Sequence, residues 1–241
     1  MRFSQFLHQQ DLIEAQKYLE EKLILFNQGK RNGQIVFMAG GAASGKGFAV
    51  SNFLEAEKFK IRDVDAWKIA LLKIHQKTGK FPGLEGLNLK KSADVLKLHN
   101  FVTSLKIKDK TLNALLMNAK PGNLPNILFD ITAKDITSIT NVIDKLIPLG
   151  YNPKDIHIVW VLTNYSLAVR ANKSRPRVVA DDIMLQTHEG AARTMWKFIK
   201  NNKLPQGING AFHIILNNRE NTIFHVNQKG EKLDGKINAQ G

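Results

Sequence analysis

Residues 34–50 read QIVFMAGGAASGKGFAV, and this stretch decides the fold of the chain. Five apolar residues, Ile35 to Ala39, run directly into a loop of small residues that ends in Gly45 and Lys46. After the loop, the apolar spacing lengthens to that of an amphipathic helix. Strand, glycine loop and helix in this order are typical of a phosphate-binding loop. Glycines let backbone N–H groups approach phosphate oxygens, and the helix N-terminus adds partial positive charge.

The loop follows the G-x-x-x-x-G-K spacing of a nucleoside triphosphate site. Gly40 and Gly45 lie at the two ends of this spacing, so we expect Lys46 to reach the terminal phosphates. The residues predicted to bind the nucleotide are Gly40, Gly41, Ala42, Ala43, Ser44, Gly45, Lys46, Gly47 and Phe48. The alternative is a glycine-rich turn between strand and helix that binds nothing.

The composition is that of an ordinary globular protein. The chain has 241 residues, of which 43% are hydrophobic and 23% are charged, which favours one large domain or one domain with an insertion. No apolar run is long enough for a membrane span, and residues 1–10 lack the apolar core of a signal peptide. The absence of cysteine excludes disulfides and thiolate metal sites. We therefore expect a cytoplasmic protein without membrane contact.

Positive charge is concentrated in one quarter of the chain. The net charge is +14, an imbalance typical of proteins with a polyanionic partner or a phosphate-rich substrate. Residues 66–126 contribute 11 Lys and no Arg against 3 acidic residues. We expect this segment to be helical and to attract a phosphorylated acceptor, which could be a nucleic acid. A solvated lysine-rich surface without a partner is the alternative.

Two carboxylates lie near the ends of predicted strands. Residues 59–65 form a short predicted strand, and Asp65 then begins a helix at the place where a general base would lie in an open α/β sheet. Asp65 could instead cap that helix, and Asp63 is the competing carboxylate. The buried strand predicted at 127–132 contains Asp130, which we expect to hold the water shell of magnesium.

A second basic segment, RANKSRPRVV, covers residues 170–179. It contains Arg170, Arg175 and Arg177, and arginine is suited to bidentate contact with phosphate. Phosphoryl transfer needs cations over the transferring group, because negative charge spreads over its oxygens. The alternative is an exposed basic loop. His188 is interpreted as an ordinary surface or core histidine rather than a catalyst.

Apolar strands alternate with helices along the rest of the chain. We expect helices at 11–26, 67–76, 92–105, 109–118, 136–149 and 181–201, and strands at 156–162, 211–216 and 222–228. The helix that follows the glycine loop should end near residue 57. This alternation predicts an α/β fold with a parallel sheet covered by helices on both faces.

The ordered set GGAASGKG, DVDAWK, ILFDIT and RANKSRPRVV resembles the zeta toxin and polynucleotide kinase branch of the P-loop kinases, over about residues 34–216. The resemblance implies the kinase-type three-layer P-loop fold with five parallel strands in the order 2-3-1-4-5. It implies that Asp65 acts as base on the acceptor hydroxyl. It also implies that Arg170, Arg175 and Arg177 belong to a lid that clamps the γ-phosphate.

Gly47 departs from the usual phosphate loop, in which a Ser or Thr follows the lysine and its hydroxyl ligates magnesium. Either Asp130 holds the metal through water or activity has been lost. The lysine-rich segment at 66–126 is a second departure, because it does not match the small-molecule members of the branch.

These patterns predict three parts of the chain. The first is an N-terminal helix, within 1–33, packed on the core. The second is a P-loop kinase-like domain at 34–228, which includes the helical insertion 66–126 and the basic lid 165–180, and the third is a flexible tail at 229–241. The expected activity is magnesium-dependent transfer of the γ-phosphate of ATP or GTP to a hydroxyl of a nucleic-acid end or a nucleotide. A nucleotide-sugar or another small phosphorylated molecule is the alternative acceptor. A non-catalytic, nucleotide-responsive nucleic-acid-binding protein is the alternative function.

Overall fold

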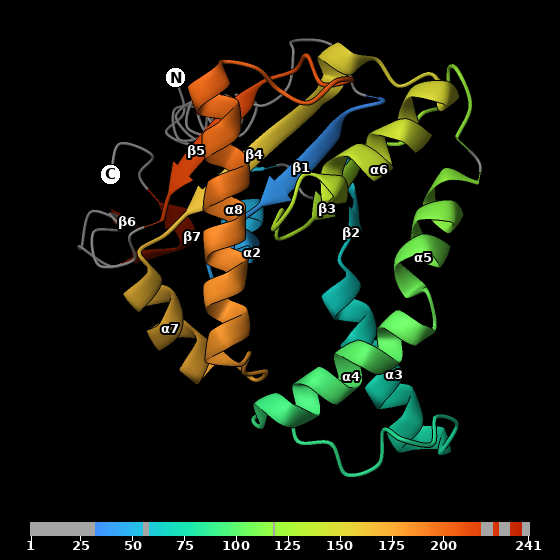
Figure 1. Cartoon of the computed structure of the whole chain (residues 1–241), viewed down its shortest axis with the longest axis vertical. Helices are drawn as coiled ribbons and strands as arrows, with labels where there is room; N and C mark the ends of the chain where they lie inside the picture. The colour runs from blue at the N-terminus through green and yellow to red at the C-terminus, as the bar shows by residue number, and fades with distance from the viewer. Residues whose placement is uncertain (1–31, 55–57, 118, 218–223, 227–231, 238–241) are drawn as a thin grey trace, which may run out of the picture.

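The computed structural model describes residues 32–54, 58–117, 119–217, 224–226 and 232–237, and Figure 1 shows their arrangement. A five-stranded sheet in this part of the chain has the order β2-β3-β1-β4-β5. Its strands are β1 Ile35–Ala39, β2 Lys60–Arg62, β3 Ile127–Asp130, β4 Ile156–Leu162 and β5 Phe212–Leu216. All four neighbouring pairs are parallel. The predicted order and direction of the strands are therefore confirmed.

Helices connect these strands in the predicted alternation. The described α-helices are α2 Lys46–Phe53, α3 Val64–Thr78, α4 Ser92–Ser104, α5 Ile107–Leu116, α6 Thr137–Leu146, α7 Tyr165–Ser174 and α8 Asp181–Asn201. Two short 3-10 turns, Ile147–Leu149 and Pro153–Asp155, lie between α6 and β4. None of the helices in the described part of the chain has the length and apolar character that a membrane span requires.

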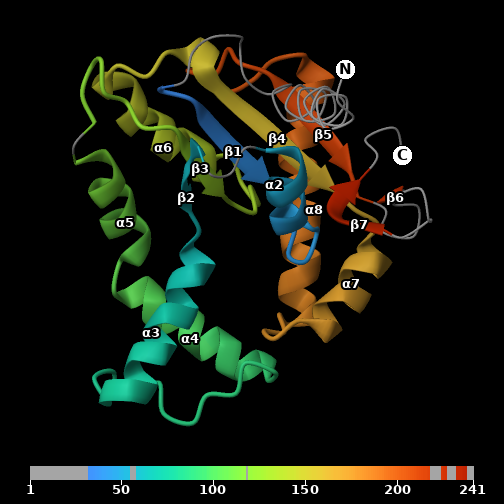
Figure 2. The same ribbon diagram turned by 180° about the vertical axis from the view of Figure 1, so that it is seen from behind.

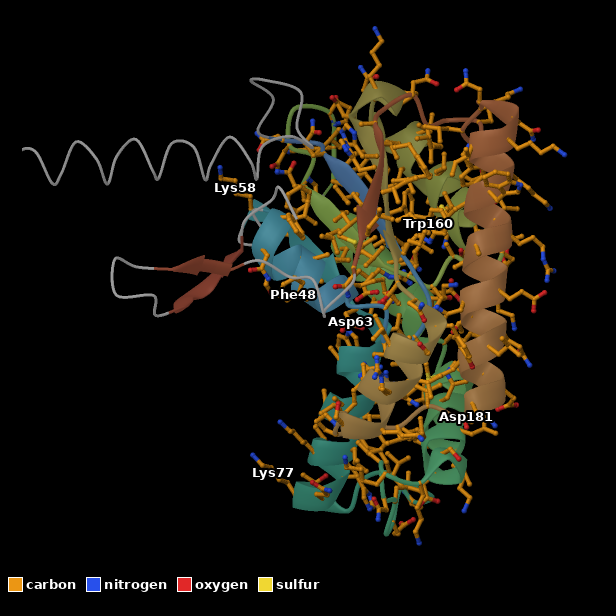
Figure 3. The ribbon with its side chains drawn as sticks, turned by 90° about the vertical axis from the view of Figure 1, so that its left-hand side faces the viewer. Phe48, Lys58, Asp63, Lys77, Trp160 and Asp181 are labelled. Atoms are coloured by element: carbon orange, nitrogen blue, oxygen red, sulfur yellow. The ribbon has the colours of Figure 1, made fainter. Side chains whose placement is uncertain are left out.

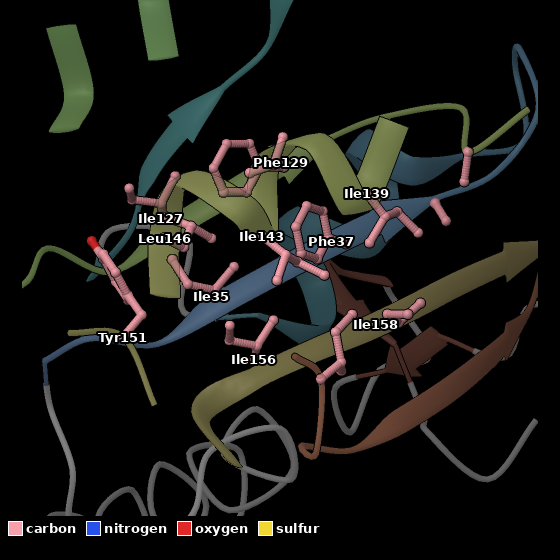
Figure 4. Close-up of a cluster of buried hydrophobic side chains, with 14 of the residues drawn as sticks. Ile35, Phe37, Ile127, Phe129, Ile139, Ile143, Leu146, Tyr151, Ile156 and Ile158 are labelled. Carbon is pink, nitrogen blue, oxygen red and sulfur yellow. The ribbon is translucent and has the colours of Figure 1, made fainter. Parts of the chain in front are cut away.

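Strand β1 is fully buried because the sheet is covered on both faces. Its residues are 0% exposed, and successive side chains of a strand point to opposite faces. One face packs Ile35 and Phe37 with side chains of α6 and α8 in the cluster of Figure 4. The other face packs Val36 and Met38 with side chains of α2. The result is a three-layer α/β sandwich, as predicted.

Between β2 and β3 the chain leaves the sheet and forms a helical arm, residues 66–126, which includes most of α3 and all of α4 and α5. The arm projects from one end of the sheet (Figures 1 and 2). A separate apolar cluster holds the arm together, and its buried members are Leu71, Leu72, Leu84, Leu98, Val102 and Ile107. Arg62 of β2 fastens the arm to the sheet, since its guanidinium donates to Thr111 Oγ1 at 3.3 Å and lies 5.6 Å from the centre of the Phe129 ring.

The predicted strand at 59–65 is too long. Strand β2 ends at Arg62 because the Asp63 side chain accepts the Asp65 N–H at 2.7 Å and starts α3 at Val64. An extended strand cannot make this capping hydrogen bond.

Two predicted helices extend into residues that the structure does not describe. The predicted helix at 11–26 lies outside the described residues. Helix α2 ends at Phe53, before the predicted end near residue 57, and residues 55–57 also lie outside the description.

The C-terminal part of the described chain forms a small hairpin. Strand β6, Phe224–Val226, pairs antiparallel with β7, Lys232–Ile237, in a sheet separate from the main one. The strand predicted at 222–228 is therefore present but not as an edge of the main sheet. Strand β7 falls inside residues 229–241, where the sequence predicts a flexible tail.

Candidate active site

The glycine loop lies at the carboxyl end of β1, between β1 and α2. Gly40 has φ 153°, and a Cβ placed there would lie 2.7 Å from Ser44 Oγ and 2.8 Å from Val161 O. Gly45 is the N-cap of α2 with φ 93° in the left-handed region. Glycine is needed at both positions, because a side chain would clash at the first and strain the backbone at the second.

The first turn of α2 supplies the main-chain groups that a phosphate requires. Lys46, Gly47 and Phe48 are the first three residues of the helix, so their N–H groups have no partner within it. No acidic residue lies in that first turn, and the positive end of the helix dipole is not neutralised there. The loop and helix therefore offer a site for an anion.

Lys46 connects this loop with the neighbouring strand. Its Nζ donates to Gly40 O at 2.9 Å and to Gly41 O at 3.3 Å, and it lies 3.6 Å from Asp130 Oδ1. The sheet register explains this meeting, because β1 pairs with β3 so that Met38 lies opposite Asp130. The lysine and the carboxylate predicted from two separate motifs therefore lie together.

Asp63, Asp65 and Asp130 lie at the same edge of the sheet. Burial raises the pKa of Asp130; Lys46 opposes this rise, and the charges of Asp63 and Asp65 add to it. Asp63 already accepts a hydrogen bond as the cap of α3. No group of three or more His, Cys, Asp or Glu side chains that could hold a metal ion occurs among the described residues.

Asp65 is held by two cations. The Arg177 guanidinium forms a bidentate pair with its carboxylate, with Nη1 2.9 Å from Oδ1 and Nη2 bonded to Oδ2, and Lys68 Nζ lies 2.8 Å from Oδ1. The side chain of Asp65 is 49% exposed, whereas those of Arg177 and Lys68 are 8% and 9% exposed. Burial alone would raise the pKa of Asp65, but Arg177 and Lys68 outweigh it and hold that pKa well below its usual range.

The alternative that Asp65 caps a helix is wrong, because Asp63 is the cap and Asp65 lies in the first turn of α3. Asp65 is instead the acidic partner of the basic segment, across 112 residues of sequence. Its carboxylate lies between the arm and the lid, with one side open to solvent.

The predicted lid, residues 165–180, contacts the arm. Val178 N donates to Leu89 O at 2.9 Å, and Lys90 Nζ donates to Arg175 O at 2.6 Å. Arg170 is an exposed residue of α7, and Arg175 ends that helix as its C-cap. Of the three predicted lid arginines, Arg177 bonds to the candidate base, Asp65.

Three residues without a predicted role contact the glycine loop. Thr187 and His188 of α8 bond to Ala42 across about 145 residues of sequence, and Asn217, which follows β5, bonds to Ser44. No local pattern could have indicated these contacts. Figure 3 shows that α8 runs from Asp181, at the level of the arm, up along the sheet.

Comparisons with known proteins give likenesses of fold only. No family model matches the chain, and no curated protein matches it. A candidate kinase from Chloroflexus aurantiacus is 10% identical with a TM-score of 0.46, over 78% of this chain and 89% of that chain. The PezAT chromosomal toxin-antitoxin system of Streptococcus pneumoniae gives 13% identity and a TM-score of 0.46, over 91% of this chain and 80% of that chain.

A deoxyadenosine kinase from M. mycoides, solved with dCMP and dCDP, is 15% identical with a TM-score of 0.39, over 78% of this chain and 91% of that chain. These identities and TM-scores are too low to assign a residue role or a substrate to the present chain. The function proposed below therefore rests on the geometry of this chain alone.

Proposed function

We propose that the protein is a phosphotransferase that moves the γ-phosphate of ATP or GTP to a hydroxyl group of an acceptor. The observation that carries this proposal is the meeting of Lys46, Asp130, Asp65 and Arg177 at one edge of the sheet. These residues come from four separate segments. A loop that merely turned from strand to helix would not need them together.

The loop and Lys46 would bind the triphosphate. N–H groups at the start of α2 donate to phosphate oxygens, and Lys46 Nζ leaves Gly40 O and Gly41 O to reach the β- and γ-phosphates. Ser44 Oγ supports this assignment, because it is buried in the loop and has no hydrogen-bond partner among the described residues. Such a hydroxyl can donate to a ligand oxygen.

Residues at this edge also fit a magnesium ion. Magnesium is usually held by one or two carboxylates together with waters and substrate phosphates, rather than by a cage of protein ligands. Asp130 meets this need, and a bound cation would favour the charged form of its carboxylate, which burial disfavours. When bound, the ion supplies positive charge to the β- and γ-phosphate oxygens. Gly47 contributes no hydroxyl, so Asp130 is the protein group that would hold it, through water.

Asp65 would accept a hydrogen bond from the acceptor hydroxyl. Its lowered pKa makes it a weak base. Phosphoryl transfer through a loose transition state nevertheless depends mainly on orientation of the nucleophile and on electrostatic stabilisation. The exposed side of Asp65 is free to receive a hydroxyl, while Arg177 and Lys68 fix its position. Arg177, together with Arg170 and Arg175 of the lid, would neutralise charge on the transferring group.

The surface of the arm favours a polyanionic acceptor. Ten of its eleven lysines are exposed, and the eleventh, Lys68, is buried on Asp65. A nucleic-acid end or a nucleotide is therefore our first choice of acceptor, and a small phosphorylated molecule is the second.

The test is transfer of labelled γ-phosphate from ATP and GTP, with magnesium, to 5′-hydroxyl oligonucleotides, nucleotides and nucleotide-sugars. Lys46→Ala and Asp65→Asn should lose transfer, and Asp65→Asn should keep nucleotide binding. Lys154→Ala and Asp144→Asn, which change exposed residues of the same types, serve as controls and should transfer normally.

A non-catalytic nucleic-acid-binding protein is the second candidate, favoured by Gly47 and by the exposed lysines of the arm. It predicts nucleic-acid affinity that falls steeply with salt and is independent of Asp65. If the protein binds the triphosphate but transfers labelled phosphate to no acceptor, the non-catalytic function is favoured over the phosphotransferase.

A further inference from the structure

Helix α8 forms two hydrogen bonds with one residue of the phosphate loop. Ala42 N–H donates to Thr187 Oγ1 at 3.2 Å, and Ala42 O lies 2.7 Å from His188 Nε2. Two successive residues of one helix therefore take both main-chain groups of Ala42. The sequence predicted no functional role for Thr187 or His188.

The hydrogen bonds of this contact are consistent with one another. Ala42 O can only accept, so His188 Nε2 carries the proton. The Thr187 hydroxyl accepts from Ala42 and donates to Met184 O at 2.9 Å, so both of its roles are filled. Burial lowers the pKa of His188, although its bond to Ala42 opposes this. The Tyr165 ring meets the imidazole edge to face at 5.4 Å and helps to fix its plane.

The imidazole also explains a glycine in the loop. A Cβ at Gly41 would lie 2.3 to 2.6 Å from three atoms of the His188 ring. Unlike Gly40 and Gly45, Gly41 has no positive φ, so its backbone does not itself require glycine. His188 is what excludes a side chain from position 41.

A second anchor holds the other half of the loop. Asn217 Nδ2 donates to Ser44 O at 2.7 Å. Asn217 is itself fixed, because its N–H donates to Leu162 O at 2.8 Å and its carbonyl accepts from Thr163 Oγ1 at 2.7 Å. The loop is therefore tied to α8 on one side and to the end of the sheet on the other, while the N–H groups at the start of α2 stay available for a ligand.

We propose that Thr187, His188 and Asn217 are positioning residues that hold the phosphate loop in its ligand-binding shape before a triphosphate arrives. This inference rests on the proposed function, which names the ligand. A loop that is already ordered loses less conformational entropy when it binds, so these contacts raise affinity without touching phosphate. His188 fixes the carbonyl of Ala42, Thr187 fixes its N–H, and Asn217 fixes the carbonyl of Ser44.

The test is the dissociation constant for ATP, and for tripolyphosphate as a probe without base or sugar, measured by calorimetry on the full chain. His188→Ala should weaken binding of both ligands about tenfold, the value of one net hydrogen bond. His188→Gln, which can still place an N–H donor at that distance, should recover most of the loss. Arg193→Ala, an exposed change on the same helix, should bind like the wild type.

Gly41 gives a second measurement that does not depend on one variant folding well. Gly41→Ala should abolish binding because of the clash with the ring. Adding His188→Ala should restore binding to the level of His188→Ala alone. Thermal melting of each variant separates loss of binding from loss of fold.

The possible outcomes separate this inference from the proposed function. If the wild type binds ATP and His188→Ala binds it equally well, or if the double variant stays as inactive in binding as Gly41→Ala, the positioning role is refuted while the phosphotransferase stands. If the wild type binds neither ATP, GTP nor tripolyphosphate, the proposed function itself has failed.

Discussion

Adding the missing hydroxyl at position 47 should strengthen the binding of magnesium-ATP. The change is Gly47→Ser, and the structure has room for it. A Cβ at Gly47 would meet no atom within 4 Å, and its φ is not in the left-handed region. Gly47 directly follows Lys46, the first residue of α2, and Lys46 lies 3.6 Å from Asp130. A hydroxyl in this turn is where phosphate loops usually ligate magnesium.

The magnitude has two parts, and a matched variant separates them. Replacing glycine in a helix stabilises it by about 0.5 to 1 kcal/mol, and Gly47→Ala carries this part without a hydroxyl. A contact between the hydroxyl and a cation should add about 1.5 to 3 kcal/mol, which is roughly 10- to 100-fold in affinity. Gly47→Ser should therefore exceed Gly47→Ala by this factor with magnesium, and the two should be equal in EDTA.

The assay is titration calorimetry of ATP against the wild type and both variants, with magnesium and with EDTA, followed by γ-phosphate transfer. Equal affinities of Gly47→Ser and Gly47→Ala in magnesium would refute the reasoning. They would mean that no cation lies near this turn when ATP is bound, and the role given to Asp130 would fall with it.

Three further predictions concern pH and stability. His157 is buried, and burial lowers its pKa from 6.5 to about 4, so the unfolded chain takes up a proton before the fold does. The free energy of unfolding should therefore fall by about 3 kcal/mol between pH 6.5 and pH 4. Urea unfolding across this range should show this fall, and the fall should be absent in His157→Asn. Arg177→Ala removes the strongest attraction on Asp65 while burial still raises its pKa, so the acidic limb of kcat/KM should move to higher pH. The limb should move less in Arg177→Lys, and a limb at one pH in all three proteins would exclude Asp65 as the titrating base. Asp63→Ala removes the cap of α3 and should lower the free energy of unfolding by about 1 kcal/mol in urea titration, whereas Asp63→Asn should lose little.

Local patterns predicted most of the elements of the fold. Strand β4 and helix α8 occupy the predicted residues 156–162 and 181–201, because a long apolar run and a long 3.6-residue period are strong signals. The predicted end of β2 was wrong, because the strand ends where the Asp63 side chain accepts a single capping hydrogen bond. The strand order followed from the family resemblance, because periodicity says nothing about which strands become neighbours.

The residues of the candidate site were also predicted in part, whereas some of their contacts were not. The sequence indicated the glycine loop, Lys46 and Asp130. The loop, which ends in Lys46, follows an apolar strand, Asp130 ends another, and strand ends of a parallel sheet meet at one edge. Asp65 and Arg177 were each predicted, but as base and phosphate clamp rather than as partners. Their pairing depends on the lid reaching the arm, which no local spacing encodes.

The sequence by itself determined the glycine loop between β1 and α2, the alternation of strands and helices, and the concentration of lysine in the arm, since these depend on residues close together in the chain. Only the tertiary structure decided which side chains from distant segments meet at the candidate site. Arg177 lies on Asp65, and His188 lies on Ala42, across more than one hundred residues in each case. Such contacts form only when the lid and α8 pack against the sheet and the arm, because a hydrogen bond depends on distance in space and not on distance along the chain.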